Sequence, residues 1–297
     1  MTKPSRFAGI ELGGTKAIAV LAKGDRIVER RVVATVEPQV TLTALRSILD
    51  DWYAFAPFEG LGIASFGPIQ LKARAHEFGQ ILPTPKPGWS GAALLEQLAD
   101  GFACPVRIDT DVNAAALAEY RWGGGAGCDS LCYVTIGTGL GGGLLISGSP
   151  VHGALHPEIG HLRFRRAPGD TFGGVCPFHG DCIEGLISGP ALARRFESDP
   201  ADVPDDHPIW HHVATDIGEL CAAILLTTSA ERILFGGSVA LSRPFLLPWV
   251  RDEVVERLAG YLPFVAPQNV GDIIQLAALG ADAGPLGAIA LAQASQP

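Results

Sequence analysis

The sequence is short of basic residues, of aromatic residues and of long apolar runs. It has 22 lysines and arginines against 31 aspartates and glutamates, a formal net charge of -9. Surfaces that bind nucleic acid normally need a basic patch, so this balance argues against a nucleic-acid partner. No apolar run approaches the roughly 20 residues of a membrane-spanning helix, and no signal-peptide core follows Met1. We therefore expect a cytoplasmic protein without a membrane partner.

Cysteine is also scarce, with six in 297 residues. A cytoplasmic compartment disfavours disulfides, so we expect none of the three that six cysteines could form. Four cysteines lie among apolar residues and are expected to be small core side chains: Cys104, Cys128, Cys132 and Cys221.

What the sequence does have is glycine, 37 residues in all, and length enough to bury a full core. Two openings of strand, glycine turn and strand, at 7–22 and 131–146, suggest a structural duplication and two α/β lobes flanking a cleft. We expect a small lobe over 1–118, with a closing helix over 284–297 packed back on it. The large lobe then spans 119–283 and carries the dimer surface.

Apolar spacing predicts the regular elements. Strands are expected at 7–12, 17–22, 27–36, 61–64, 106–108, 131–136, 144–146 and 231–235. Helices are expected at 42–52, 92–98, 112–120, 190–196, 209–228, 245–258 and 284–293. Residues 66–89 are rich in proline and glycine and are expected to be irregular.

A short stretch of the second lobe holds four potential metal ligands. Cys176, His179 and Cys182 follow one another at intervals of three, so one tight loop can aim all three inward, and His161 can close the site. Thiolates and imidazoles in a four-ligand set suit a structural Zn²⁺ ion. The alternative is two buried thiols and two surface histidines. The rarity of the spacing favours zinc.

Three glycine turns follow directly after predicted strands: 11–16, 136–143 and 234–238. Glycine allows a backbone to approach phosphate oxygens, and Thr15 and Thr138 can donate hydroxyl groups. The carboxylate of Glu11 can hold a water molecule of Mg²⁺. One such turn is often only a hairpin, but three in these positions indicate a nucleotide site. None has the spacing of a P-loop.

With these motifs the chain resembles sugar kinases of the ROK family, within the actin/hexokinase (ribonuclease H-like) ATPase fold. Within that family it is similar to the bacterial fructokinase branch. This closer similarity rests on Ala64–Ile69, Thr84–Trp89, Asp109–Asn113 and the histidine-containing zinc loop. The resemblance implies an ATP-dependent, two-lobed kinase that phosphorylates fructose, with Mg²⁺ bound alongside ATP. A homodimer is usual for such relatives.

The resemblance also implies roles for individual residues. Asp111 would be the general base, expected to cap the following helix and to be kept ionised by the helix dipole. Sugar contacts would come from Gly67, Thr110, Glu158, His161 and Glu184, with His161 also bound to zinc. The turn at 86–89 would border the same pocket. Nucleotide contacts would come from Gly13, Gly14, Thr15, Lys16, Thr138, Gly139, Gly141, Pro190, Gly236, Gly237 and Ser238.

Three residues depart from the broader family's pattern. Thr110 stands where most of the kinases have asparagine, Glu11 where many have aspartate, and His179 where cysteine is usual. All three departures are those of the fructokinase branch. They indicate a substrate class and no loss of activity.

Three alternative functions fit parts of the sequence. A kinase for mannose, glucose or N-acetylmannosamine is the main alternative, because sugar specificity rests on one or two hydrogen bonds. A sugar-responsive regulator is disfavoured, because the family's repressors carry a helix-turn-helix domain before the first glycine turn. A catalytically silent sugar sensor is disfavoured by intact Asp111, Thr15 and Thr138.

Overall fold

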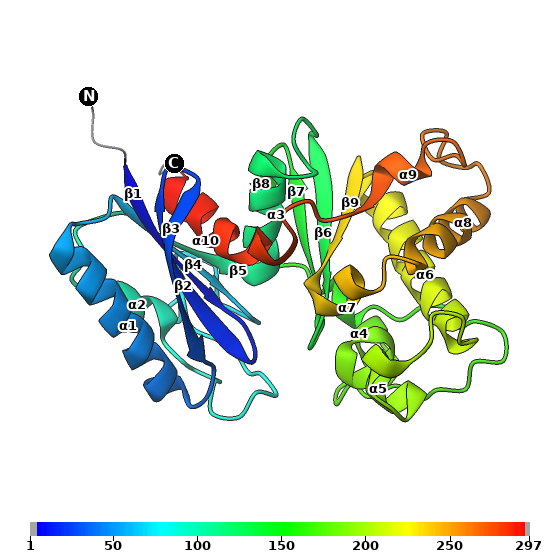
Figure 1. Cartoon of the computed structure of the whole chain (residues 1–297), viewed down its shortest axis with the longest axis horizontal. Coiled ribbons are helices and arrows are strands. Elements are labelled where there is room, and N and C mark those ends of the chain that lie inside the picture. Colours follow the sequence, from blue (N-terminus) through cyan, green and yellow to red (C-terminus); the bar gives the residue numbers. More distant parts are fainter. Residues whose placement is uncertain (1–4, 295–297) are drawn as a thin grey trace. The chain divides into compact units, whose positions relative to one another are not determined.

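The computed structural model describes residues 5–294, which form two compact α/β units (Figure 1). Unit 1 contains residues 5–121, 149–157 and 282–294, and unit 2 contains 122–148 and 158–281. The short segment 149–157 thus belongs to unit 1, although the sequence assigned it to the second lobe. Residues 295–297 of the predicted closing helix lie outside the described residues.

Unit 1 is built on a five-stranded sheet with the order β3-β2-β1-β4-β5. Its strands are β1(Arg6–Leu12), β2(Lys16–Lys23), β3(Arg26–Ala34), β4(Gly60–Ser65) and β5(Val106–Thr110). The first three are joined as antiparallel hairpins, and β1, β4 and β5 are parallel. Its helices are α1(Pro38–Phe55), α2(Leu94–Ala99), α3(Asp111–Trp122) and α10(Ala283–Gln293), preceded by the short turn η3(Gly280–Asp282).

The two faces of this sheet are separated by the alternation of side chains along β1. Ala8, Ile10 and Leu12 join a fully buried cluster with Leu42, Leu45, Leu49 and Trp52 of α1. On the opposite face α10 lies directly on glycines. A Cβ atom on Gly62 would approach the carbonyl oxygen of Ala288 to 1.9 Å. Glu11 therefore points to the face that α10 covers.

Unit 2 repeats this plan with the strands β6(Ser130–Ile136), β7(Leu140–Ile146), β9(Arg232–Gly236) and β10(Ile274–Leu276). β6 and β7 form an antiparallel hairpin, β9 runs parallel to β6, and β10 runs parallel to β9. The same relations join β1, β2, β4 and β5. The predicted structural duplication is therefore present. The two-residue strand β8(Ser149–Pro150) opens the segment that returns to unit 1.

The helices of unit 2 surround a second core. They are η1(Ile159–His161), α4(Ile183–Ile187), α5(Gly189–Phe196), η2(Pro200–Asp202), α6(Ile209–Thr228), α7(Gly237–Ser242), α8(Leu246–Leu258) and α9(Val270–Ile273). α6 lies beside α8 (Figure 1). Most residues of α6 are buried.

By length and composition α6 could cross a membrane, although its sequence is not an unbroken apolar run. Its 18-residue apolar window is 61% buried inside the structure. Core helices of soluble proteins commonly have this composition, so the helix is weak evidence for a membrane span.

Candidate active site

The first glycine turn joins β1 to β2 in unit 1. The N–H of Gly13 donates to the carbonyl oxygen of Lys16 at 3.0 Å, which closes the turn. Nothing lies within 4 Å of a Cβ atom built on Gly14, and Thr15 and Lys16 are exposed. The turn is therefore open at the residues that the sequence assigned to phosphate.

Glu11 precedes this turn and is enclosed by α10. A Cβ atom on Gly284 would come within 2.1 Å of Glu11 Oε1, so only glycine fits there. Burial, and next the negative charge of Asp111, raise the pKa of Glu11 to about 7. The two carboxyl groups are therefore close enough to influence one another.

Asp111 is the first residue of α3. Burial raises its pKa to about 6, although the N–H of Val112 donates to Asp111 Oδ1 at 2.9 Å and opposes the shift. Desolvation is the largest cause of this shift, and a pKa of about 6 still leaves the carboxylate mostly ionised at neutral pH, the state expected from the sequence. A pKa near 6 suits a general base, which must be ionised and still basic near neutral pH.

Thr110 performs the capping role that the sequence gave to Asp111. The N–H of Asn113 donates to Thr110 Oγ1 at 3.1 Å, the hydrogen bond expected of a helix cap. The Thr110 side chain is 2% exposed. The Asp111 side chain therefore does not cap the helix, and its Oδ1 atom accepts a hydrogen bond from the adjacent N–H of Val112.

A second carboxylate, that of Asp109, is buried two residues before Asp111. Asp109 Oδ1 accepts hydrogen bonds from the N–H of Thr110 at 2.7 Å and from Asn113 Nδ2 at 2.8 Å. His152 Nε2 lies 3.1 Å from Asp109 Oδ2, and this hydrogen bond raises the pKa of His152. Sequence reasoning missed His152, because it reaches Asp109 from the segment 149–157, far along the chain.

The predicted sugar contact Gly67 also depends on a residue that the sequence did not single out. Gly67 lies in the loop after β4, and a Cβ atom there would approach the His156 ring to 3.2 Å. His156 Nε2 accepts a hydrogen bond from the N–H of Ile69 at 3.1 Å, and burial lowers the pKa of His156. A neutral His156 therefore holds this loop.

The second glycine turn, in unit 2, is shorter than predicted. The N–H of Gly137 donates to the carbonyl oxygen of Gly139 at 2.9 Å, and β7 already begins at Leu140. Gly141 consequently lies in the strand, opposite Thr135, and outside the turn. The predicted returning strand began four residues too late, because a run of glycines resembles a loop in sequence.

Glu184, a predicted sugar contact, is tied to this turn. Its Oε2 atom accepts a hydrogen bond from the N–H of Leu140 at 3.0 Å. A Cβ atom on Gly139 would lie 2.8 Å from the same oxygen. Gly139 is therefore required for this approach of a carboxylate to the turn, while Thr138 is exposed beside it.

The third turn, at the end of β9, packs against the second. Gly237 has a φ of +83°, and a Cβ atom there would lie 2.4 Å from the carbonyl oxygen of Ile136. At Gly236 a Cβ atom would meet the Tyr133 hydroxyl at 2.0 Å. Side chains are thus excluded at both positions.

A cavity of about 320 Å³ opens next to this turn within unit 2. Its lining residues are Gly189, Asp199, Pro200, Ala201, Trp210, Ser238, Val239, Ser242 and Arg243. It adjoins two predicted nucleotide contacts, since Ser238 lines it and Pro190 follows Gly189. Its size is that of a small-molecule site.

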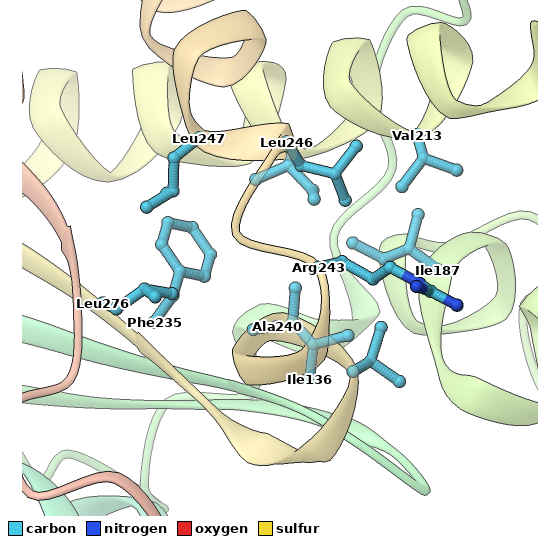
Figure 2. A pocket seen from close by; sticks show the side chains of 11 residues that line it. Ile136, Ile187, Val213, Phe235, Ala240, Arg243, Leu246, Leu247 and Leu276 are labelled. Carbon is cyan, nitrogen blue, oxygen red and sulfur yellow. The ribbon is translucent and has the colours of Figure 1, made fainter. Parts of the chain in front are cut away.

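A second hollow in unit 2 is a gap in the core (Figure 2). Figure 2 shows Phe235, Leu246, Leu247 and other apolar side chains around it, with Arg243 at its border. Its volume of about 20 Å³ holds little more than one water molecule. It is too small for a sugar or a nucleotide.

The four predicted metal ligands converge within unit 2. Their ligand atoms all lie within 4.8 Å of one another. Cys176 Sγ lies 3.8 Å from His161 Nδ1 and 3.7 Å from His179 Nδ1, and Cys182 Sγ lies 3.6 Å from His161 Nδ1. Tetrahedral Zn²⁺ places a sulfur and a nitrogen ligand about 3.6 Å apart. The donor set therefore fits that ion.

The structure thus groups the predicted residues by unit. Unit 1 holds the first turn, Gly67, Thr110 and Asp111, and unit 2 holds the other two turns, Glu184 and the metal ligands. In unit 2, Glu158 is exposed and directly precedes η1, which ends at His161. The Nδ1 atom of His161 faces the sulfur atoms, so its Nε2 atom remains available to another partner.

Comparison with known proteins identifies the family of the chain. Residues 7–295 match the model of the ROK family. The chain belongs to the ROK family. It is 40% identical over 307 residues to a fructokinase of Zymomonas mobilis, covering 98% of this chain and 97% of that protein. It is 36% identical over 290 residues to a fructokinase of Pediococcus pentosaceus, covering 97% and 98%.

A solved structure of the same family has the same fold. This is a ROK family glucokinase from Streptomyces griseus, in complex with glucose and AMPPNP. It matches with a TM-score of 0.76 and 25% identity, over 97% of this chain and 99% of that one. The two α/β units described above therefore have the architecture of ROK kinases.

Proposed function

We propose that the protein is an ATP-dependent fructokinase that forms fructose 6-phosphate. The observation that carries the proposal is the similarity, over nearly the whole chain, to two proteins named fructokinase at 36% and 40% identity. The three glycine turns and Asp111 supply the groups that phosphoryl transfer requires.

Asp111 is the general base of this proposal. Its carboxylate takes the proton of the 6-hydroxyl group as that oxygen forms a bond to the γ-phosphorus of ATP. The bond from the γ-phosphorus to the bridging oxygen breaks, and ADP leaves with that electron pair. The pKa of about 6 supports this role, because the group is mostly ionised at neutral pH and still accepts a proton.

Five residues are proposed to orient the sugar. Unit 1 offers Gly67 and Thr110, and unit 2 offers Glu158, Glu184 and the Nε2 atom of His161. The hydrogen bond from Leu140 to Glu184 supports a fixed orientation of that carboxylate. Glu158 is exposed, and its carboxylate can accept hydrogen bonds from sugar hydroxyl groups.

The nucleotide would lie on the glycine turns, with the adenosine in the cavity beside Ser238. The open Gly14 turn and the Gly137–Gly139 turn present backbone N–H groups without side chains in the way. Mg²⁺ bound with ATP would neutralise phosphate charge, and Glu11 is the carboxyl group nearest to the first turn in sequence. Many relatives have aspartate at this position, and the glutamate side chain of this protein is longer by one methylene group.

We further propose that His161, Cys176, His179 and Cys182 bind one structural Zn²⁺ ion. All four coordination positions would be filled by protein, so the ion would stabilise the loop and take no part in the reaction. Because His161 would be both a ligand and a sugar contact, the metal would fix one wall of the sugar site.

We propose that the protein works in the cytoplasm, since ATP and hexoses are available there. We further propose that it forms a homodimer, the usual form of the relatives that it resembles. Light scattering of the purified protein measures the assembly directly. A mass near 31 kDa would mark a monomer and twice that value a dimer.

A glucose kinase is the second candidate, favoured by the likeness to the glucokinase solved with glucose. Rates with fructose, mannose, glucose and N-acetylmannosamine and MgATP separate the candidates. We expect kcat/KM to be highest for fructose by at least about tenfold, a difference of roughly 1.4 kcal/mol in transition-state binding. A higher value for glucose would replace the fructokinase assignment, and no turnover of any sugar would reject the kinase.

A further inference from the structure

Lys86 carries a positive charge to the first glycine turn. It lies in the irregular segment between β4 and α2, all within unit 1. Its Nζ atom donates a hydrogen bond to the carbonyl oxygen of Gly14 at 2.5 Å and lies 5.9 Å from the centre of the Phe66 ring. Phosphate oxygens bound at the Gly14 turn would therefore be next to an ammonium group.

The backbone around Lys86 is held in place by contacts of its neighbours. The Trp89 side chain is fully buried, and its Nε1–H group donates to the carbonyl oxygen of Val36 at 2.9 Å. The rings of Trp89 and Phe66 meet edge to face at 5.2 Å. Ser90 Oγ accepts from the N–H of Thr84 at 3.1 Å, which closes the turn around Lys86. The ammonium group is thus held by a built turn, although the side chain itself is long.

Lys86 also has hydrogen-bonding capacity to spare. An ammonium group has three N–H donors, and Gly14 uses one of them. The space above Gly14 is open, and Lys86 is only half-buried. A phosphoryl group can reach the remaining donors without displacing any side chain from the turn.

We propose that Lys86 contacts the γ-phosphoryl group of ATP and stabilises its charge during transfer. The inference rests on the proposed kinase function, because the transferred group is the phosphoryl group of that reaction. Negative charge is carried on the three equatorial oxygens of the γ-phosphoryl group while the bond to ADP breaks and the bond to the sugar oxygen forms. A fixed ammonium group beside these oxygens lowers the barrier without itself exchanging a proton.

The first test is steady-state kinetics on Lys86→Met, with Lys86→Arg and Lys72→Met as comparisons. Lys72 is an exposed lysine of the same segment. Loss of one such contact typically lowers kcat by about 10²–10³, and we expect this of Lys86→Met with the sugar KM within threefold. Lys86→Arg should recover at least a tenth of the wild-type kcat, and Lys72→Met should match the wild type.

The second test distinguishes a contact with phosphate from a hydrogen bond to Gly14 that is purely structural. Calorimetry compares a non-hydrolysable ATP analogue with ADP. We expect Lys86→Met to raise the Kd of the analogue by about tenfold and the Kd of ADP by less than twofold, since only the analogue has a γ-phosphate. Lys86→Gln serves as the charge-free variant if Lys86→Met does not fold.

Three results would overturn the proposal for Lys86. They are a kcat within threefold of wild type, an equal loss of affinity for both nucleotides, or a rise in the sugar KM alone. The last would instead make Lys86 a sugar contact. Failure of the kinase function itself is separate, because the wild-type protein would then turn over no sugar.

Discussion

At the scale of residues, the carboxyl group of Asp111 is expected to lower the stability of the protein in favour of its activity. Burial raises its pKa from 3.8 to about 6, so the folded state favours the protonated form. The stability that this preference contributes is fully present below about pH 4 and is lost as the pH rises through 6. At neutral pH the protein therefore keeps an ionised base at some cost to its stability.

Asp111→Asn should remove the activity and raise the melting temperature at pH 8. Asparagine is neutral and nearly isosteric, so the cost of burying a charge disappears, whereas proton transfer is lost. We expect kcat to fall by about 10²–10⁴ with ATP affinity within a few-fold. Kinetics and thermal melts at pH 4 and pH 8 provide the measurements, with little change in melting temperature at pH 4.

Glu158→Gln is the matched comparison for that variant. A positioning contact should raise the sugar KM more than it lowers kcat. If Asp111→Asn retained more than about a tenth of the wild-type kcat, the loss would be too small for general-base catalysis.

The sequence could predict the site residues that belong to a local pattern. It could not predict the residues that hold the site in place. Asp111, Gly139 and the four metal ligands stand in recognisable motifs. His152 and His156 do not, because their partners Asp109 and Ile69 are distant in sequence and meet them only after folding. The helix cap was predicted at Asp111 but is provided by Thr110. Threonine and aspartate are both good caps, so the sequence alone does not distinguish between the two neighbours.

At the scale of elements, a buried ion-pair network attaches the loop 162–182, which holds three of the proposed metal ligands, to two helices of unit 2. Arg195 of α5 contacts Asp170 at 2.5 Å and Asp216 of α6 at 2.9 Å. Arg166 contacts Asp170 at 2.5 Å and donates to the carbonyl oxygen of Phe172. Burial alone would raise the pKa of Asp170, but the hydrogen bond from Arg166 helps to lower it.

Arg195→Met should destabilise the protein strongly, and more at pH 8 than at pH 5. The variant leaves Asp170 without one partner and Asp216 without its close one, and burial already raises the pKa of Asp216. The loss should be roughly 3 kcal/mol at pH 8, as for other broken buried pairs, and smaller at pH 5, where Asp216 protonates more readily. Denaturant unfolding at both pH values measures it.

Arg194→Met is the control, because Arg194 neighbours Arg195 on α5 and is exposed. It should change the unfolding free energy by less than about 0.5 kcal/mol. Equal effects of the two variants would show that the charge network does not stabilise the loop.

Long helices and apolar strands were predictable, whereas glycine-rich and short elements were not. The helix over 209–228 was predicted with its observed bounds, because its apolar residues continue over five turns. β7 was misplaced, since Gly141–Gly143 have no side chains to show an alternating pattern. α7 and β10 were missed because six and three residues are too few to show a period.

At the scale of the whole molecule, the duplicated plan gives each unit a hydrophobic core of its own. One cluster is formed entirely by residues of unit 1, and the other by residues of unit 2. The metal ligands belong to unit 2 alone, where Cys182 is fully buried beside α4. Loss of the metal should therefore act on one core more than on the other.

Stripping zinc with a strong chelator should loosen unit 2 and leave unit 1 protected. Elemental analysis should first give close to one zinc per chain, and a value below a tenth would reject the site. Amide hydrogen exchange should then rise in peptides covering 162–187 and the adjoining α6. Peptides of β1 and β4 should change by less than about threefold, because their hydrogen bonds lie in the other sheet.

Cys182→Ser provides the same loss without a chelator, and Cys221→Ser is its control. Cys221 is equally buried but lies in α6, outside the metal cluster. Zinc content should fall only in Cys182→Ser, together with sugar affinity, since Glu184 follows two residues later on α4. Equal acceleration of exchange in both units would instead mean that the two cores unfold as one, and that the metal stabilises the molecule as a whole.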